Sequence, residues 1–343
     1  MKAIVYDNYG GIDALQLREV EKPSPGDHEV LIKVKAVSIN DWDWGKMDGK
    51  SLFNRIFSGV WKPRHQVLGS DVAGRIEAVG KNVSRFKIGD EVYGDLSGRW
   101  GGFAEYCCAD EKQLALKPAA MSFIEAAAIP QAGMLAVQGL IDKGKIKGGD
   151  KVLINGGGGG VGTFAVQIAK TFGADVTGVD HTSKLKMMLS VGFDYVIDYT
   201  QEDFTKNGKQ YDIVLDAKTN RSIFHYLRAL KSDGVYVTVG GSMSRLFQIM
   251  LLLPFMSTFS KKKVSIVVLR PNKDLEYMNK LFVEGKLRAI VDGHFTLSQV
   301  PDAFRVFSKA EHKGKIVISV DADPPLPLLR RSPESFGPGG DVV

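Results

Sequence analysis

Cysteine and long apolar runs are both scarce in this chain of 343 residues. Its two cysteines, Cys107 and Cys108, are adjacent in sequence, so they cannot form the disulfide framework of a small secreted protein. The chain has no run of about eighteen apolar residues, and its first residues contain no signal-peptide core. We therefore expect a protein of a reducing compartment, the cytoplasm, with no membrane-spanning segment.

A strong excess of one charge is also missing. The sequence has 45 lysines and arginines against 39 acidic residues, a formal net charge of +6. The one short basic run, residues 261–263, is typical of a solvated turn, so we expect no nucleic-acid partner. The hydrophobic share of 44% and the charged share of 24% are ordinary for a globular enzyme, and the length predicts two domains.

The pattern of secondary structure changes twice along the chain. Residues 1–121 contain short, often alternating apolar runs between glycine, proline and aspartate turns, which is typical of a β-rich domain. Residues 122–264 alternate strands with helices, which predicts a doubly wound parallel sheet. Residues 265–320 return to strand, helix and strand, and we expect them to rejoin the first domain. Residues 321–343 are rich in proline and lack periodicity, which predicts a disordered tail.

The most informative feature of the chain is a run of glycines between a buried-strand pattern and a helix pattern. Residues 151–154 are mostly apolar, and residues 161–172 repeat apolar side chains at helical spacing. Glycines let the backbone turn sharply and approach a ligand, and the helix N-terminus offers free N–H groups to a pyrophosphate. This context predicts a dinucleotide site. Its candidate cofactor-binding residues are Gly157, Gly158, Gly159, Gly160, Val161 and Gly162.

An acidic residue follows at the end of the next predicted strand. Residues 174–179 are largely apolar and lead into Asp180. In dinucleotide-binding folds a carboxylate at this position holds the hydroxyl groups of the adenosine ribose. Asp180 is therefore a candidate cofactor-binding residue. It favours NADH, because a carboxylate repels the 2′-phosphate of NADPH.

Motifs outside the glycine turn are individually weak, but their order and spacing are together specific. They are Asn40-Asp41-Trp42-Asp43, Leu68-Gly69-Ser70-Asp71-Val72-Ala73-Gly74, residues 86–94, residues 101–106, residues 126–130 and Gly314-Lys315-Ile316-Val317. With these motifs, residues 1–320 resemble the medium-chain dehydrogenase/reductase superfamily, and most of all its zinc-free quinone oxidoreductase-like branch. The resemblance implies an α/β protein with a GroES-like catalytic domain, a Rossmann domain and a cleft between them for hydride transfer.

The resemblance also bears on metal binding. Zinc-binding members of the superfamily have a cysteine where this chain has Asn40, and Gly-His-Glu where it has Gly69-Ser70-Asp71. Their structural zinc needs four closely spaced cysteines, and none of the six histidines here has a metal-ligand pattern. We therefore expect no metal. Asn40 becomes the candidate catalytic residue, as a hydrogen-bond donor to the substrate or the nicotinamide side. The alternative for Asn40 is a turn residue that bonds its own backbone.

Further cofactor contacts implied by the resemblance are at Lys184, Tyr199, Gly240 and Lys315. Lys184 and Tyr199 match positions that grip the 2′-phosphate in relatives that use NADPH. Asp180, in contrast, matches relatives that use NADH. The sequence therefore predicts a nicotinamide cofactor and leaves the preference between NADPH and NADH open.

The absence of metal ligands favours an activated acceptor. The carbonyl oxygen of a quinone or an enone becomes a delocalised phenolate or enolate as hydride arrives, and hydrogen-bond donors suffice to stabilise it. We predict a zinc-independent oxidoreductase that transfers hydride from NAD(P)H to a quinone or another conjugated carbonyl compound. The alternatives are an NAD(P)-dependent alcohol dehydrogenase and, from another class, a nucleotide-sensing or RNA-binding protein on the same fold.

One apolar stretch, residues 246–259, has no role in these motifs. It is too short to span a bilayer and contains Pro254. Four interpretations remain for it: buried core, the surface of a homodimer, a lid over a lipophilic substrate tail, or a peripheral membrane contact. Since relatives are often dimers, we expect a homodimer.

Overall fold

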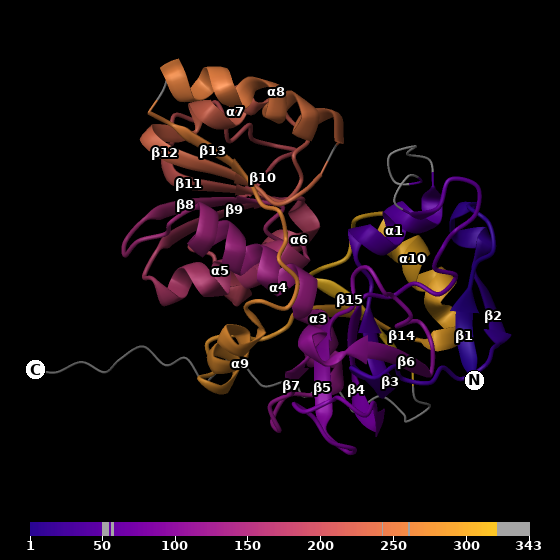
Figure 1. Cartoon of the computed structure of the whole chain (residues 1–343). Helices are drawn as coiled ribbons and strands as arrows, with labels where there is room; N and C mark the ends of the chain where they lie inside the picture. Colours follow the sequence, from indigo (N-terminus) through magenta and orange to yellow (C-terminus); the bar gives the residue numbers. More distant parts are fainter. Residues whose placement is uncertain (50–54, 56–57, 242, 260, 321–343) are drawn as a thin grey trace, which may run out of the picture.

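Two lobes, each built around its own sheet, make up the structure (Figure 1). The computed structural model describes residues 1–49, 55, 58–241, 243–259 and 261–320, so the predicted tail lies outside the described residues. One lobe combines the two ends of the described chain, and the other is formed by its middle. The predicted α/β fold is confirmed, with one β-rich lobe and one lobe built on a doubly wound parallel sheet.

The first lobe is mainly an antiparallel sheet. Its elements are β1 (Lys2–Val5), β2 (Gln16–Glu19), β3 (Glu29–Ser38), α1 (Asp41–Asp48), β4 (Asp71–Val79), β5 (Glu91–Asp95), β6 (Tyr106–Asp110), β7 (Ala115–Leu116), β14 (Val291–Thr296), α10 (Val300–Ser308) and β15 (Lys315–Ser319). Seven of the strands form one sheet in the order β14-β15-β3-β4-β5-β7, with β6 paired to β3. Val30, Ile32 and Val34 of β3 are fully buried, as expected for alternate residues of a central strand. Because β15 pairs with β3, the returning chain lies beside the N-terminal third.

The second lobe is a parallel sheet covered by helices. Its elements are β8 (Lys151–Asn155), α5 (Gly160–Thr171), β9 (Asp175–Asp180), α6 (Thr182–Val191), β10 (Tyr195–Asp198), β11 (Tyr211–Asp216), α7 (Ile223–Arg228), β12 (Leu230–Thr238), α8 (Met243–Phe259) and β13 (Lys263–Ile266). The strand order β10-β9-β8-β11-β12-β13 places the topological reversal between β8 and β11, where doubly wound folds bind dinucleotides. The domain boundary predicted after residue 264 falls inside β13, so the parallel sheet continues to Ile266.

Helices join the two lobes. They are α3 (Phe123–Ala128), α4 (Pro130–Val137), a π-helical turn (Gln138–Lys143) and α9 (Leu275–Val283). Pro130 occupies the first turn of α4, where its missing N–H has no partner to lose. Across the two lobes, Gly314 N donates to Gly158 O at 2.9 Å. The carboxyl ends of β8 and β9 therefore lie against the first lobe.

The apolar stretch predicted at residues 246–259 forms most of α8. Ile249 is buried, whereas Phe247, Met250 and Leu251 are each more than half exposed. The interpretation as buried core is therefore wrong for this exposed face. Within the part of the chain that the structure describes, no helix has the length and apolarity needed to cross a membrane.

Candidate active site

The glycine turn joins β8 to α5 and lies over the end of β9. The N–H groups of Gly156 and Gly157 both donate to Val179 O, at 2.9 and 3.1 Å. Gly156 has a φ of +85°, a conformation that favours glycine. A Cβ on Gly157 would lie 2.7 Å from Met188 Cε. The turn therefore brings bare backbone to the N-terminus of α5, where free amides suit a pyrophosphate.

The predicted residues of this turn come together in one loop and the first helical turn. They are Gly157, Gly158, Gly159, Gly160, Val161 and Gly162. Gly162 packs against the loop, because a Cβ there would lie 2.5 Å from Gly157 Cα and 2.6 Å from Gly157 O. The glycines therefore let the loop pack closely against the first turn of α5, and the free amides at this end of the helix suit the phosphates of a dinucleotide.

Asp180 is turned toward the backbone of the glycine turn. Its Oδ2 accepts from Gly158 N and its Oδ1 from His181 N, each at 2.9 Å. The Lys184 ammonium lies 3.7 Å from Asp180 Oδ1 and donates to Ala310 O at 2.8 Å. Both side chains are buried. Asp180, which favours NADH by its position in the sequence, and Lys184, which favours NADPH, thus form an ion pair.

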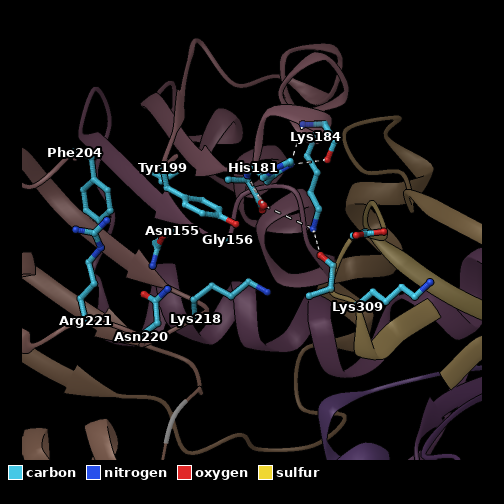
Figure 2. Close-up of a pocket in the computed structure, with 15 residues that line it drawn as sticks. Asn155, Gly156, His181, Lys184, Tyr199, Phe204, Lys218, Asn220, Arg221 and Lys309 are labelled. Atoms are coloured by element: carbon cyan, nitrogen blue, oxygen red, sulfur yellow. Dashed lines mark hydrogen bonds and ion pairs between the residues drawn. The ribbon is translucent and has the colours of Figure 1, made fainter. Parts of the chain in front are cut away.

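A cavity of about 460 Å³ opens beside this pair (Figure 2). Asp180, Lys184 and Tyr199, three of the residues predicted to bind the cofactor, line it. Basic side chains that no motif predicted, including Lys218 and Lys309, line it as well. Figure 2 shows Lys184, Lys218 and the Tyr199 hydroxyl pointing into the same space. The cavity can hold the adenosine end of a dinucleotide.

Gly240 and Lys315 lie away from this cavity. Gly240 follows β12 with a φ of +150°, and its carbonyl accepts from Thr219 Oγ1. The stem of Lys315 lies against Gly160, but its ammonium donates to Ile39 O at 2.9 Å and to Asn40 Oδ1. The buried Lys315 charge therefore faces the catalytic lobe, and a direct contact of Lys315 with the cofactor stays a prediction.

Asn40 is the centre of a buried polar group. It is the N-cap residue of α1, and Asn40 N donates to Asp43 Oδ2 at 2.9 Å. The other Asp43 oxygen accepts from Gly69 N at 2.9 Å, which ties the Asn40 segment to the segment that carries Ser70. Asn40 Nδ2 donates to Ser70 Oγ at 3.2 Å. The amide of Asn40 is therefore held on both sides, by Lys315 and by Ser70.

Asp71 is the counter-charge of Lys315. Its Oδ2 lies 3.9 Å from the ammonium and accepts from Gln131 N at 3.1 Å, whereas its Oδ1 has no hydrogen-bond partner among the described residues. Burial raises the pKa of Asp71 and lowers the pKa of Lys315, and their mutual attraction opposes both shifts. The ammonium that Asp71 partly neutralises is the one that donates to Asn40 Oδ1, so the buried pair and the Asn40 amide form one connected group.

The pH dependence of stability tests the burial of Asp43. Burial raises its pKa to about 7 from 3.8, against two backbone hydrogen bonds that lower it. Between these two pKa values the folded state keeps a proton that the unfolded chain releases. The free energy of unfolding should therefore fall as the pH rises from 3.8 to about 7, by about 1.4 kcal/mol per pH unit. Urea unfolding at about pH 5 and about pH 7 gives the change of the unfolding free energy with pH. This change should be smaller for Asp43→Asn than for the wild type. The exposed control Asp41→Asn should keep the wild-type slope, and parallel profiles for all three proteins would refute the argument.

Sequence reasoning missed several residues of the site. Asp43, Ser70 and Asp71 were recognised only as parts of motifs, and Lys218 was not recognised at all. The signal for Asp71 was an acidic residue directly before a run of apolar strand residues, a position that burial of the strand extends to the carboxylate. Nothing in the local pattern around Lys218 marks it as part of a site.

Zinc does not fit the donor set at this position. Asn40 stands where zinc-binding relatives have a cysteine ligand, and its Oδ1 already accepts from the Lys315 ammonium. A metal cation at this oxygen would be repelled by the ammonium. In the described ranges, no group of three or more His, Cys, Asp or Glu side chains is arranged to hold a metal ion. The site therefore offers hydrogen-bond donors in place of a Lewis acid.

Comparisons with known proteins agree with this geometry. The alcohol dehydrogenase GroES-like domain family matches residues 26–119, and the zinc-binding dehydrogenase family matches residues 191–318. A 2-methylene-furan-3-one reductase of Solanum lycopersicum is 34% identical over 93% of this chain and 79% of its own. A chloroplastic NADPH-dependent alkenal/one oxidoreductase of Arabidopsis thaliana is 33% identical with the same coverage.

The solved structures give the same result. The quinone oxidoreductase from Coxiella burnetii superposes with a TM-score of 0.84 at 29% identity, over 94% of this chain and 99% of that one. Likeness of this extent covers both lobes and the joint between them. The chain is an oxidoreductase that belongs to the medium-chain dehydrogenase/reductase superfamily, in its quinone oxidoreductase-like branch.

Proposed function

We propose that this enzyme uses NADPH, without zinc, to reduce a quinone or the carbon–carbon double bond of an enone. The observation that carries the proposal is the buried group of Asn40, Ser70 and Lys315, which offers hydrogen-bond donors where zinc-binding relatives have metal ligands. The names of two relatives, an alkenal/one oxidoreductase and a quinone oxidoreductase, support the same class of acceptor.

Bound NADPH would supply the hydride. The residues of the chain stabilise the negative charge that develops on the substrate oxygen. The Lys315 ammonium fixes the Asn40 amide and draws electron density toward Asn40 Oδ1, which makes the Nδ2 hydrogens better donors. One of these hydrogens goes to Ser70 Oγ, and the second can bind the carbonyl oxygen of the substrate. This oxygen gains negative charge during the reaction, so a fixed donor lowers the barrier. We propose that water delivers the proton.

The preference for NADPH follows from the arrangement of charges around the cavity. Asp180 is neutralised by Lys184 and bonded to the backbone, so it repels a 2′-phosphate less than a free carboxylate would. Further lysines line the cavity, and the Tyr199 hydroxyl points into it. The name of the Arabidopsis relative, an NADPH-dependent enzyme, supports this choice.

Loss of the near-ultraviolet absorbance of the reduced cofactor tests the proposal. Purified enzyme with excess chelator should oxidise NADPH only when a benzoquinone or an enone is added, and should oxidise NADH more slowly. Turnover that disappears with chelator would refute metal-free reduction. Nucleotide binding without turnover of any such acceptor would favour the sensing role, and oxidation of simple alcohols with NADP⁺ would favour the alcohol dehydrogenase.

A homodimer and a cytoplasmic location also belong to the proposal. The exposed face of α8, with Phe247, Met250 and Leu251, supports an interface better than a lid, because these side chains point to solvent in the single chain. The same face of α8 suits a peripheral membrane contact, so the test must distinguish a dimer interface from membrane binding. Sedimentation of the purified protein as a monomer would reject the dimer.

A further inference from the structure

Lys218 reaches the cofactor cavity from the far side of the topological reversal. It follows β11, whereas Asp180 ends β9. The stem of Lys218 lies over the glycine turn: a Cβ on Gly156 would be 3.1 Å from Lys218 Cγ and 3.3 Å from Lys218 Cε. Gly156 N donates to Val179 O, the neighbour of Asp180. Lys218 therefore extends toward the end of the cavity where the adenosine ribose is expected (Figure 2).

The turn that carries Lys218 is held by a buried carboxylate. Asp216 Oδ1 accepts from the N–H groups of Lys218 and Thr219, at 3.0 and 2.9 Å, and Asp216 Oδ2 accepts from Tyr236 OH at 2.7 Å. Thr219 is fully buried and has a φ of +43°, which is unfavourable for a β-branched residue. Such strain persists only where the surroundings impose it, and it concentrates at ligand sites.

Positive charge exceeds negative charge around the cavity. The charged side chains that line it are Lys184, Lys218, Arg221, Lys309, Asp180 and Glu311. Asp180 neutralises Lys184, and Arg221 pairs with Asp203. Among the described residues, the Lys218 ammonium has no hydrogen-bond or ion-pair partner. Burial lowers the pKa of Lys184, Asp180 opposes this, and the Lys218 charge lowers it further, so the two ammonium groups repel each other. An anion between them would relieve the repulsion.

We propose that Lys218 binds the 2′-phosphate of NADPH and, together with Lys184, sets the preference for NADPH over NADH. The inference rests on the proposed function, of which it specifies the cofactor recognition. The backbone amides at the start of α5 suit the pyrophosphate of the cofactor. The 2′-phosphate needs cations beside the ribose, where the ammonium groups of Lys184 and Lys218 converge and can both donate charge-assisted hydrogen bonds.

The dissociation constants of NADPH and NADH, measured by fluorescence titration, test the proposal. The two cofactors differ only in the 2′-phosphate. The Lys218→Met variant should lose about 10- to 100-fold in affinity for NADPH and keep its affinity for NADH. Lys218→Arg should retain most of the NADPH affinity, since it keeps the charge. The matched control is Lys186→Met, an exposed lysine of α6 outside the cavity lining, and it should bind both cofactors as the wild type does.

Three results would overturn the assignment. An equal loss for NADPH and NADH would place Lys218 at a phosphate that both cofactors share. Unchanged affinity for both would mean that Lys218 makes no contact with the cofactor. Wild-type enzyme that binds the two equally would refute the NADPH preference and the role of Lys218 together. A wrong acceptor class, in contrast, would change turnover and leave these binding constants as expected.

Discussion

Replacing Gly162 by valine is expected to abolish cofactor binding. The new side chain would begin at a Cβ placed 2.5 Å from Gly157 Cα and 2.6 Å from Gly157 O, and overlapping Gly156 O. These are backbone atoms, so relief requires the glycine turn to move away from the N-terminus of α5. The turn is tied to Val179 by two hydrogen bonds, and shifting it removes the phosphate cradle. We expect the affinity for NADPH to fall by about 100-fold or more, which corresponds to about 3 kcal/mol.

The measurement is a fluorescence titration with NADPH, accompanied by circular dichroism to show that the variant is folded. Gly148→Ala is the matched control, because a Cβ there meets only Phe172 O at 3.7 Å. The control should bind NADPH as the wild type does. A folded Gly162→Val variant with wild-type affinity would show that the cofactor does not depend on this turn.

Replacing Lys315 by methionine should lower both stability and kcat. The change leaves Asp71 as a buried carboxylate without its counter-charge, and removing one partner of a buried pair costs about 3–5 kcal/mol. It also removes the donor that holds Asn40 Oδ1, so the amide can turn away from the substrate. We expect kcat to fall by about 100-fold, as for the loss of a fixed donor to a developing oxyanion. The KM for NADPH should change little, because the ammonium faces away from the cofactor cavity.

Urea unfolding and steady-state kinetics separate the two effects. The double variant Lys315→Met with Asp71→Asn should recover part of the stability, since no unpaired carboxylate remains, but it should not recover kcat. A positioning role for Lys315 predicts this division. A raised KM for NADPH with unchanged kcat would contradict it and would favour the direct cofactor contact that the resemblance implies.

The fold and the glycine turn could be predicted because their determinants are local. A strand pattern, glycines and a helix pattern follow each other between residues 151 and 172, and the structure has β8, the turn and α5 in that order. Helix α10 is likewise marked locally, because Pro301 lies in its first turn and apolar side chains follow at helical spacing. The roles of the glycines and of Asn40 stay predictions until cofactor binding and turnover are measured.

The polar arrangement of the site could not be predicted, because it depends on contacts between distant parts of the chain. Lys315 and Asn40 are 275 residues apart, and they meet only because β15 pairs with β3. Asp180 illustrates a second limit. Its position at the end of β9 was expected, but the direction of its carboxylate depends on Gly158 N and Lys184. Sequence patterns place a residue on an element and leave its hydrogen-bond partners open.

The most direct test of metal-free enone reduction follows deuterium from labelled NADPH. The cofactor carries the label at the transferable position of its nicotinamide ring, and the enzyme is mixed with an enone in the presence of chelator. The proposed reaction predicts that deuterium appears on the carbon β to the carbonyl group of the product. Deuterium on the carbonyl carbon itself would contradict the proposal and would assign the chain to alcohol dehydrogenase chemistry.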